Sequence, residues 1–204
     1  MAVKLTKNEQ KKQKDKLKQF TRYLPTLQLK KQQLQMVIRG IESKVAALKI
    51  EQKQLVEGMQ DWICVYAENK VFADDKELSN LVKIDRVVRV KSNIAGVTIP
   101  EFKELTFQEI EYDLNEYPLW VDDGIETLRD YARLDALIST LDIQLNLLGK
   151  ELRTTSQRVN LFEKVKIPEA KNNIKKIRIY LGDQQTAAVV RGKIAKTKTV
   201  GGQA

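Results

Sequence analysis

The chain has 204 residues, of which 31% are charged, 6% aromatic and 42% hydrophobic, and its formal net charge is +9. This composition is typical of long helices rather than of a compact mixed fold, and it excludes a disordered chain. A single cysteine, Cys64, and no histidine exclude an intrachain disulfide framework and argue against a structural zinc site and histidine-based catalysis.

The first residues, MAVKLTKNEQKKQKDK, lack the apolar core of a signal peptide. No run in the chain approaches 18 apolar residues, which a membrane-spanning helix needs. We therefore expect a cytoplasmic protein of a reducing compartment, with no direct membrane insertion.

A long heptad run follows. Stepping +3 and +4 from Leu17 reaches fifteen positions, of which thirteen are apolar, with Lys31 and Gln52 as the polar exceptions. This a/d pattern predicts a coiled-coil helix, and Pro25, just outside the seam, predicts a kink or a weakly formed helix before it. The positions are Leu17, Phe20, Leu24, Leu27, Lys31, Leu34, Ile38, Ile41, Val45, Leu48, Gln52, Leu55, Met59, Trp62 and Tyr66.

The middle of the chain changes character. The stretch DRVVRVKSNIAGVTIPEF is rich in Val and Ile and predicts a β-hairpin, with strands at 87–91 and 96–99 and a turn at 92–95. Pro100 is expected to end the second strand or lie at its edge, and the next residues to be extended or a short helix. A lone hairpin is marginally stable, so we expect it to pack through Val88, Val90, Ile94, Val97 and Ile99.

The segment VDDGIETL predicts the start of a second long helix, with Asp122 or Asp123 as its N-cap. A second heptad run includes nine apolar residues in ten positions: Tyr131, Leu134, Ile138, Leu141, Leu145, Leu148, Leu152, Thr155, Val159 and Phe162.

The phase of this second run then slips. The next regular set is Ala170, Ile174, Ile177 and Leu181, reached from Phe162 by two steps of four through Lys166. Such a stutter unwinds the supercoil locally, and Pro168 lies inside it. A proline in a helix interior costs roughly 3 kcal/mol, so its place at the break indicates a change of twist.

These elements predict an all-α dominated fold: a long antiparallel two-helix coiled coil with a short β-hairpin inserted between the helices. The expected segments are a first helix within 1–84, the hairpin and its connections at 85–120, a second helix within 121–190, and a basic flexible tail at 191–204. On periodicity alone, a coiled-coil spacer or two helices of a bundle remains the simplest interpretation.

The charge is uneven. Residues 1–40 carry a net +9 and residues 163–204 a net +7, which leaves −7 for 41–162. In an antiparallel hairpin the two basic ends lie side by side, so a partner should offset their repulsion. Nucleic acid is one candidate, and a basic coiled-coil nucleic-acid-binding or scaffold protein is the alternative function. However, no nucleic-acid motif accompanies the charge.

No catalytic constellation is found. The RGK and GGQA segments near the C-terminus are not phosphate-binding loops, and paired carboxylates occur by default on charged helices. We predict no catalytic, cofactor-binding or metal-binding residues, and no cofactor.

The stretch RTTSQRVNLFEKVKIPEAKNNIKKIRIYLGDQQ resembles the C-terminal helix of the D subunit of V-type and archaeal-type ATPases and ATP synthases. The segments LQLKKQQL (27–34), NIAGVTIPEF (93–102) and YPLWVDDGIETLRDYARLD (117–135) are similar to further parts of that family, so the resemblance covers almost the whole chain. The residues that carry the C-terminal fingerprint are Arg158, Val159, Asn160, Glu163, Ile167 and Pro168.

The resemblance implies a non-catalytic rotor shaft, the central stalk of a complex at the membrane periphery that couples ATP hydrolysis or synthesis to ion translocation. It implies as partners the A and B subunits of the catalytic hexamer, the F subunit and a connecting subunit above the membrane ring, and no nucleic acid. As contacts of the rotor tip with the hexamer we predict Lys4, Lys7, Lys11, Lys12, Arg191 and Lys193.

Overall fold

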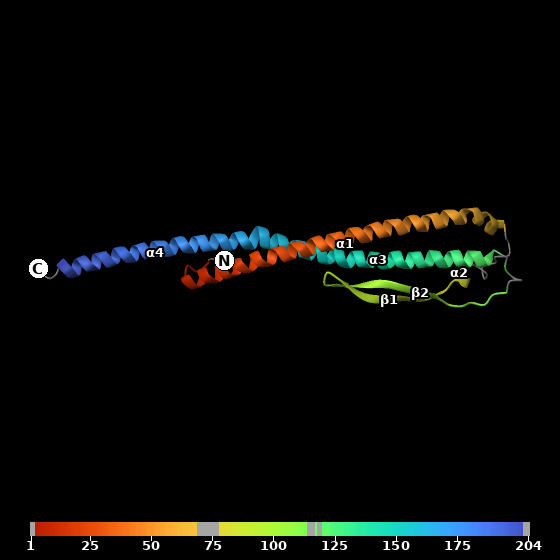
Figure 1. The fold of residues 1–204 in the computed structure, drawn as a ribbon, viewed down its shortest axis with the longest axis horizontal. Coiled ribbons are helices and arrows are strands. Elements are labelled where there is room, and N and C mark those ends of the chain that lie inside the picture. The colour runs from red at the N-terminus through yellow and green to blue at the C-terminus, as the bar shows by residue number, and fades with distance from the viewer. Residues whose placement is uncertain (1–2, 69–77, 114–116, 118–119, 202–204) are drawn as a thin grey trace. The chain divides into compact units, whose positions relative to one another are not determined.

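The computed structural model describes residues 3–68, 78–113, 117 and 120–201, and confirms the predicted helical fold with an inserted hairpin (Figure 1). The chain forms two compact units, Gln33–Leu152 and Met1–Gln32 with Arg153–Ala204, and each is described by itself. In chain order the elements are α1 Lys7–Glu68, α2 Leu78–Leu81, β1 Ile84–Ile94, β2 Val97–Phe107, α3 Val121–Leu161, the π-helix η2 Phe162–Lys166 and α4 Ile167–Gly201.

The first heptad run is confirmed along α1. Each predicted seam position from Leu17 to Met59 is buried or half-buried, whereas the neighbouring positions are mostly exposed. The side chains of Trp62 and Tyr66 lie outside the described part of the structure. α1 begins at Lys7 and continues through Pro25. The residues before that proline are therefore part of the same regular helix, and not a weakly formed one.

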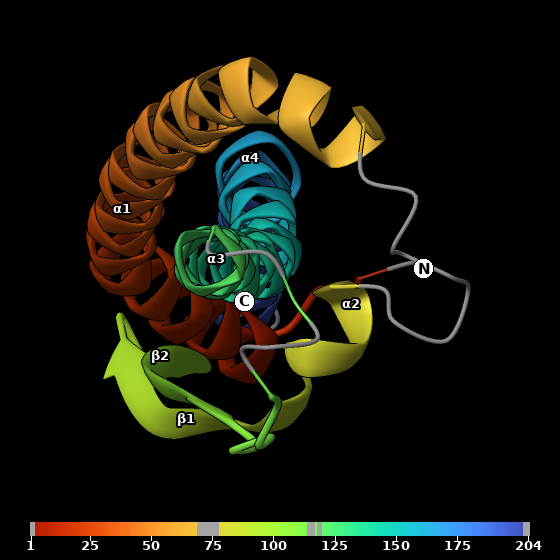
Figure 2. The same cartoon turned by 90° about the vertical axis from the view of Figure 1, so that its right-hand side faces the viewer.

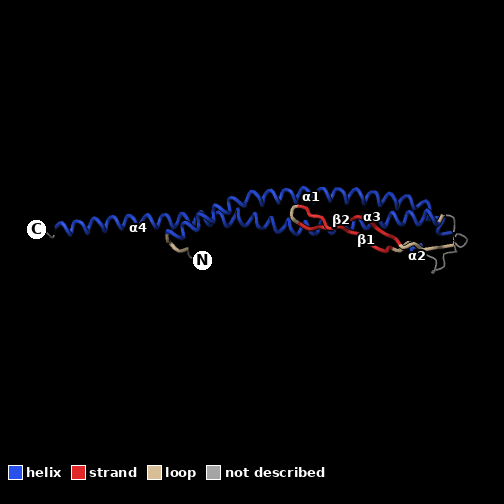
Figure 3. Tube along the Cα trace, turned by 60° about the horizontal axis from the view of Figure 1, so that its bottom comes forward, coloured by secondary structure: helices blue, strands red, loops and turns tan. Residues whose placement is uncertain are grey.

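Within the unit Gln33–Leu152, α1 and α3 lie side by side and run in opposite directions (Figure 1, Figure 3). Their seam forms the core of this unit, and Ile99 from β2 joins it. The fully or nearly fully buried members are Leu34, Ile41, Val45, Ile99, Ile138 and Leu148. Most of the second heptad run is therefore confirmed, but Tyr131, its first position, is 36% exposed and lies outside the core.

A second buried face of α3 receives the hairpin. Ala136, Thr140 and Gln144 are spaced four residues apart, and all three are buried. Thr140 Oγ1 accepts a hydrogen bond of 3.1 Å from Arg89 Nε of β1. Viewed along the helices, the hairpin and the later part of α1 lie on different sides of α3 (Figure 2).

The hairpin is longer than predicted, with eleven residues in each strand. Its turn consists of Ala95 and Gly96, whose φ angles of 52° and 79° are both positive, as a type I′ turn requires. The side chain of Asn93 accepts a hydrogen bond of 3.0 Å from the Gly96 N–H. The turn predicted at 92–95 was therefore placed too early, because Ser92 and Asn93 remain in the ladder.

Pro100 does not end the second strand, which continues to Phe107. Ile94 pairs with Val97 next to the two-residue turn, so by alternation the pair Lys91 and Pro100 is a pair without ladder hydrogen bonds. The missing N–H of Pro100 therefore costs the ladder nothing. Its carbonyl oxygen accepts a hydrogen bond of 2.5 Å from Gln144 Nε2 of α3.

The second long helix begins one residue before the predicted caps. The Gly124 N–H donates to the Trp120 carbonyl at 3.0 Å, so Asp122 and Asp123 lie in the first turn of α3 rather than at its N-cap. Their carboxylates still favour the positive end of the helix dipole.

The predicted phase slip is a π-helix. In η2 the Ile167 N–H donates to the Phe162 carbonyl, five residues earlier. A regular heptad would place the position after Lys166 at residue 169, but the buried residue is Ala170, 3% exposed. The π turn thus contains one residue more than a regular turn, and the apolar residues after it again face the same side as those before it. It also lies just before Pro168, whose ring would clash with the carbonyl of Lys164 in a regular α-helix.

Of the residues predicted to form a basic flexible tail, 191–201 are helical, since α4 continues to Gly201. Residues 202–204 lie outside the described part of the structure. All residues from 182 to 199 are exposed.

A deletion can test the role of the π-helix. Removing the half-exposed Val165 together with Pro168→Ala should convert this turn to α-helix and keep the seam, because one surplus residue and its proline are both gone. We expect the free energy of unfolding, measured by urea denaturation, to stay within about 1 kcal/mol of wild type.

The matched control is deletion of the exposed Asn172, beyond the π-helix. That change rotates Ile177, which is fully buried, out of the seam. It should cost about 2–5 kcal/mol, the usual cost of losing a buried large side chain. Equal destabilisation by both deletions would show that the π-helix does not absorb the extra residue.

Candidate functional site

The described residues contain no group of three or more His, Cys, Asp or Glu side chains that could hold a metal ion. Within the same residues, no helix is both long enough and apolar enough to cross a membrane. The features that remain as candidates are surfaces for other proteins, and the strongest charge lies in the unit that contains both termini.

A cap fixes where α1 begins. Thr6 Oγ1 accepts a hydrogen bond of 3.2 Å from the Glu9 N–H, and the Thr6 carbonyl accepts one of 2.9 Å from the Gln10 N–H. The carboxylate of Glu9 in turn accepts a bond of 2.9 Å from Gln13 Nε2. The sequence Thr-x-x-Glu is a capping-box pattern, and it could have located this helix start.

The first part of α1 packs on η2 and on the beginning of α4. The rings of Phe20 and Phe162 stack with centroids 5.2 Å apart and an interplanar angle of 27°. A small cavity of about 390 Å³ between the same segments is lined by Lys4 on one side and by Ala170 and Asn173 on the other. Lys4 therefore lies at the level of Asn173 on α4.

The six predicted tip residues are all exposed, but they do not form one cluster. Lys4 lies at the level of Asn173, with Lys7, Lys11 and Lys12 in the first turns of α1. Arg191 and Lys193 lie at least 18 residues further along α4, roughly 27 Å at the rise of an α-helix. The sequence interpretation placed the two basic segments side by side, but α4 continues past the start of α1, so they are not level (Figure 1).

The end of α4 is a single helix without a neighbour among the described residues. It carries four Lys or Arg residues and one Asp between positions 182 and 201. Large apolar side chains are also exposed there: Val189 at 59%, Val190 at 49% and Ile194 at 50%. An isolated helix is marginally stable in water, so this basic and apolar surface is suited to a partner.

The fingerprint residues surround the π-helix. Val159 is 4% exposed and belongs to the seam, and Ile167 is half-buried and closes the π turn through its N–H. Arg158, Asn160, Glu163 and Pro168 are exposed.

The residues predicted for hairpin packing have three different environments. Ile94, Val97 and Ile99 join the core between α1 and α3. Val88 is half-buried, and Val90 is 48% exposed. The pairing register shifts between Val88 and Arg89, and beyond the shift Arg89 reaches α3.

A polar cluster lies near the start of α3. The Tyr112 hydroxyl donates a short hydrogen bond to Asp122, and this bond raises the pKa of Tyr112 above its usual value, with burial and the Asp122 charge adding to the effect. Nearby, the guanidinium groups of Arg129 and Arg133 lie 5.7 and 5.5 Å from the ring centroid of Phe107. These contacts join the strand end to α3 and stabilise the hairpin base.

Comparison with known proteins gives consistent results. The family profile described as the D subunit of ATP synthase matches residues 9–197. A protein of Borreliella burgdorferi, named as the D subunit of a V-type ATP synthase, is 52% identical over 97% of this chain and 95% of its own length. A protein of the same name from Chlamydia muridarum is 35% identical over 96% of this chain and 95% of its own length.

The Tyr112 contact generates a pH prediction. Because its pKa is raised in the folded state, Tyr112 contributes stability fully at pH values below about 10 and loses it as the pH rises through the folded pKa. At pH 8, Tyr112→Phe should lower the free energy of unfolding by about 1 kcal/mol or less. Ultraviolet titration of wild type minus variant should show one tyrosine that ionises above pH 10, and ionisation at or below pH 10 would contradict this assignment.

Proposed function

The chain belongs to the family of ATP synthase D subunits, and from this membership we propose how it works: as the non-catalytic rotor shaft of a V-type ATPase or ATP synthase. The observation that carries the proposal is the match over residues 9–197, which includes both long helices and the hairpin.

The helices have the properties that a shaft needs. Torque is transmitted by elements that resist twisting, and α1 is one helix of 62 residues. Its apolar seam packs against α3 in one unit, and in the other Phe20 stacks on Phe162 of η2. Rotation of one helix about its axis would therefore expose buried side chains. The shaft does no chemistry itself but moves against catalytic subunits.

The proposed partners are the A and B subunits of the catalytic hexamer, the F subunit and a subunit that connects the shaft to the membrane ring. The end of the protein that contains the first turns of α1 and the last turns of α4 would enter the hexamer. There the two segments would present exposed Lys and Arg side chains at two levels along the shaft. An asymmetric tip of this kind presents different faces to the catalytic interfaces as it turns, and so biases each between discrete states.

The alternative of a basic nucleic-acid-binding coiled coil rests only on the charge. The relatives reported above are named as ATP synthase subunits. The two hypotheses can be distinguished by purifying the tagged chain from its native cells and identifying the proteins that co-purify with it by mass spectrometry. Recovery of A, B and F subunits supports the shaft, and recovery of nucleic acid without them contradicts it.

The tip charges give the sharpest test. Replacing Lys4, Lys7, Lys11, Lys12, Arg191 and Lys193 together by Gln should leave the chain folded, because all six are exposed. It should weaken docking to the hexamer about tenfold or more and reduce coupled ATPase activity, since each single exposed charge contributes little but six act together.

The control removes the same charge from the other unit: Lys49, Lys53, Lys83, Arg86, Lys91 and Lys103, which are also exposed. This variant should keep hexamer binding. The tip hypothesis is wrong if both variants bind the hexamer like wild type, or if both lose binding equally, since the second result would report net charge alone.

A further inference from the structure

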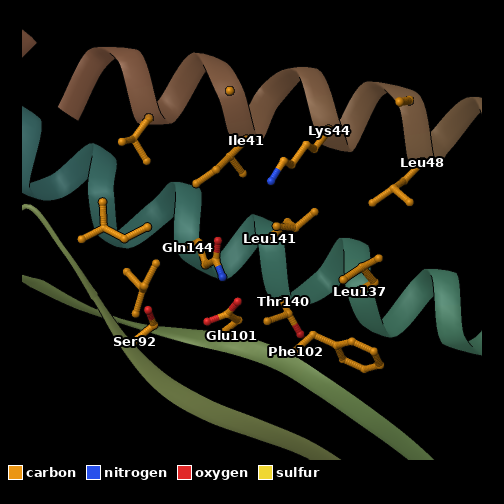
Figure 4. A pocket seen from close by; sticks show the side chains of 15 residues that line it. Ile41, Lys44, Leu48, Ser92, Glu101, Phe102, Leu137, Thr140, Leu141 and Gln144 are labelled. Carbon is orange, nitrogen blue, oxygen red and sulfur yellow. The ribbon is translucent and has the colours of Figure 1, made fainter. Parts of the chain in front are cut away.

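The last twenty residues of α4, 182–201, are called the α4 extension here, and no packing within the described chain supports them. Every residue from 182 to 199 is exposed. The other unit differs, because there Ile41 and Leu48 of α1 point toward α3, and Leu141 of α3 packs in the same core (Figure 4). Most of the stability of a helix in a protein comes from such packing. The α4 extension therefore depends on its own helix propensity.

The composition of the α4 extension disfavours a free helix. Three of its residues are glycine, and seven are the β-branched residues Thr, Val or Ile. Even good helix formers have a propagation constant of only about 1–1.6, and a glycine lowers this constant about fivefold relative to alanine. Where the constant is below one, each further residue makes the helix less populated. Without a partner, the helix should therefore fray from Gly201 back toward Leu181.

Side-chain contacts within the α4 extension do not compensate. Its one acidic residue, Asp183, has no basic residue three or four positions away, so it has no partner for a stabilising ion pair along the helix. Lys193 and Lys196 are three residues apart and repel each other. Thr197 Oγ1 donates a hydrogen bond of 2.9 Å to the Lys193 carbonyl, four residues earlier, and such a contact slightly destabilises a helix.

The α4 extension nevertheless has a face that is suited to burial. Ala187, Val190 and Ile194 follow one another at steps of three and four, and basic residues lie on both sides of them. This stripe lies roughly 120–180° around the helix from Leu181, so it does not continue the seam with α1. The three apolar residues share one face only when the segment is helical. A surface that covers them therefore favours the helix over the disordered segment.

We propose that the α4 extension is disordered in the free chain and becomes helical when it docks, so that binding and folding of this segment are coupled. The helix that reaches Gly201 in Figure 1 is the docked conformation. The partner is the catalytic hexamer, and the inference rests on the proposed function for this identity alone. The affinity is reduced by the fraction of free chains in which the extension is already helical. The glycine and β-branched content of the segment thus limits the affinity of the shaft for the hexamer.

Hydrogen exchange of the free, full-length chain, followed by mass spectrometry, tests the disorder. The amides of residues 182–201 should exchange within about tenfold of the rate of an unstructured peptide, whereas those around the fully buried Leu148 should be slowed about a thousandfold or more. Addition of the purified catalytic hexamer should slow exchange in 182–201 by about tenfold or more. Slow exchange of this segment in the free chain would overturn the inference, as would fast exchange that the bound hexamer leaves unchanged.

A double substitution tests the coupling. Gly182→Ala with Gly192→Ala should raise the helix population of the free extension, because a Cβ at either position meets nothing within 4 Å and alanine favours the helix about fivefold at each. Exchange of residues 182–201 should slow, and the Kd for the hexamer should fall about tenfold, since less ordering remains to be done on docking. Slower exchange with an unchanged or higher Kd would overturn the coupling.

The matched control is Gly40→Ala with Gly149→Ala, the same change in α1 and α3, where a Cβ again meets nothing within 4 Å. This variant should raise the Tm of the free chain by about 4 °C and leave both the exchange of 182–201 and the Kd unchanged. Equal gains in affinity from the two variants would overturn the inference, because general stability would then set the affinity. If the wild-type chain does not bind the hexamer at all, the proposed function is contradicted, whereas exchange in the free chain still decides whether the extension is disordered.

Discussion

The structure depends on keeping one apolar stripe of α1 opposite a stripe of the returning helix. Leu34, Ile41 and Val45 are buried with Ile138 and Leu148 in one unit, and Phe20 stacks on Phe162 in the other. Each buried apolar side chain contributes roughly 1.5–3 kcal/mol, so a register error that turns several of them outward would exceed the marginal stability of a typical domain. The π-helix at Phe162–Lys166 follows from this constraint, because a sequence with one surplus residue must either lose the seam or widen one turn.

The sequence predicts the parts of the fold that depend on periodicity, and it misses those that depend on tertiary contacts. The seam predicted for α1 is confirmed at every position from Leu17 to Met59, because a heptad run of that length fits only one face of the helix. Of the two alternatives predicted for Pro100, the end of the strand is wrong, whereas a place at the edge of the sheet without a ladder hydrogen bond agrees with the pairing register. The sequence could not choose between them, because the choice depends on that register and on Gln144, which lies 44 residues away in sequence. Ala95, with a φ of 52°, occupies a turn position where glycine or asparagine is usual, so the turn could not be located from residue preference.

The candidate tip was predictable in composition but not in position. Counting charges shows that both ends are basic, yet it cannot give the offset between them, because heptad spacing fixes which residues face each other only up to whole repeats. The structure sets the offset through Lys4 and Asn173, which line the same small cavity. As a result four of the predicted contacts lie on a two-helix segment and two on a single helix, and these segments offer a partner different stiffness and different apolar area.

The same helix, α1, uses its faces for different purposes. Its seam is closed by this chain, whereas the face that carries Met36, Gly40 and Ile50 is left open. A glycine in the middle of an exposed helix destabilises it by about 1 kcal/mol relative to alanine, and a Cβ at Gly40 would meet no atom of the described residues within 4 Å. Nothing in the described part of the chain therefore requires a glycine at this position, in contrast to Gly96, whose φ of 79° the hairpin turn needs.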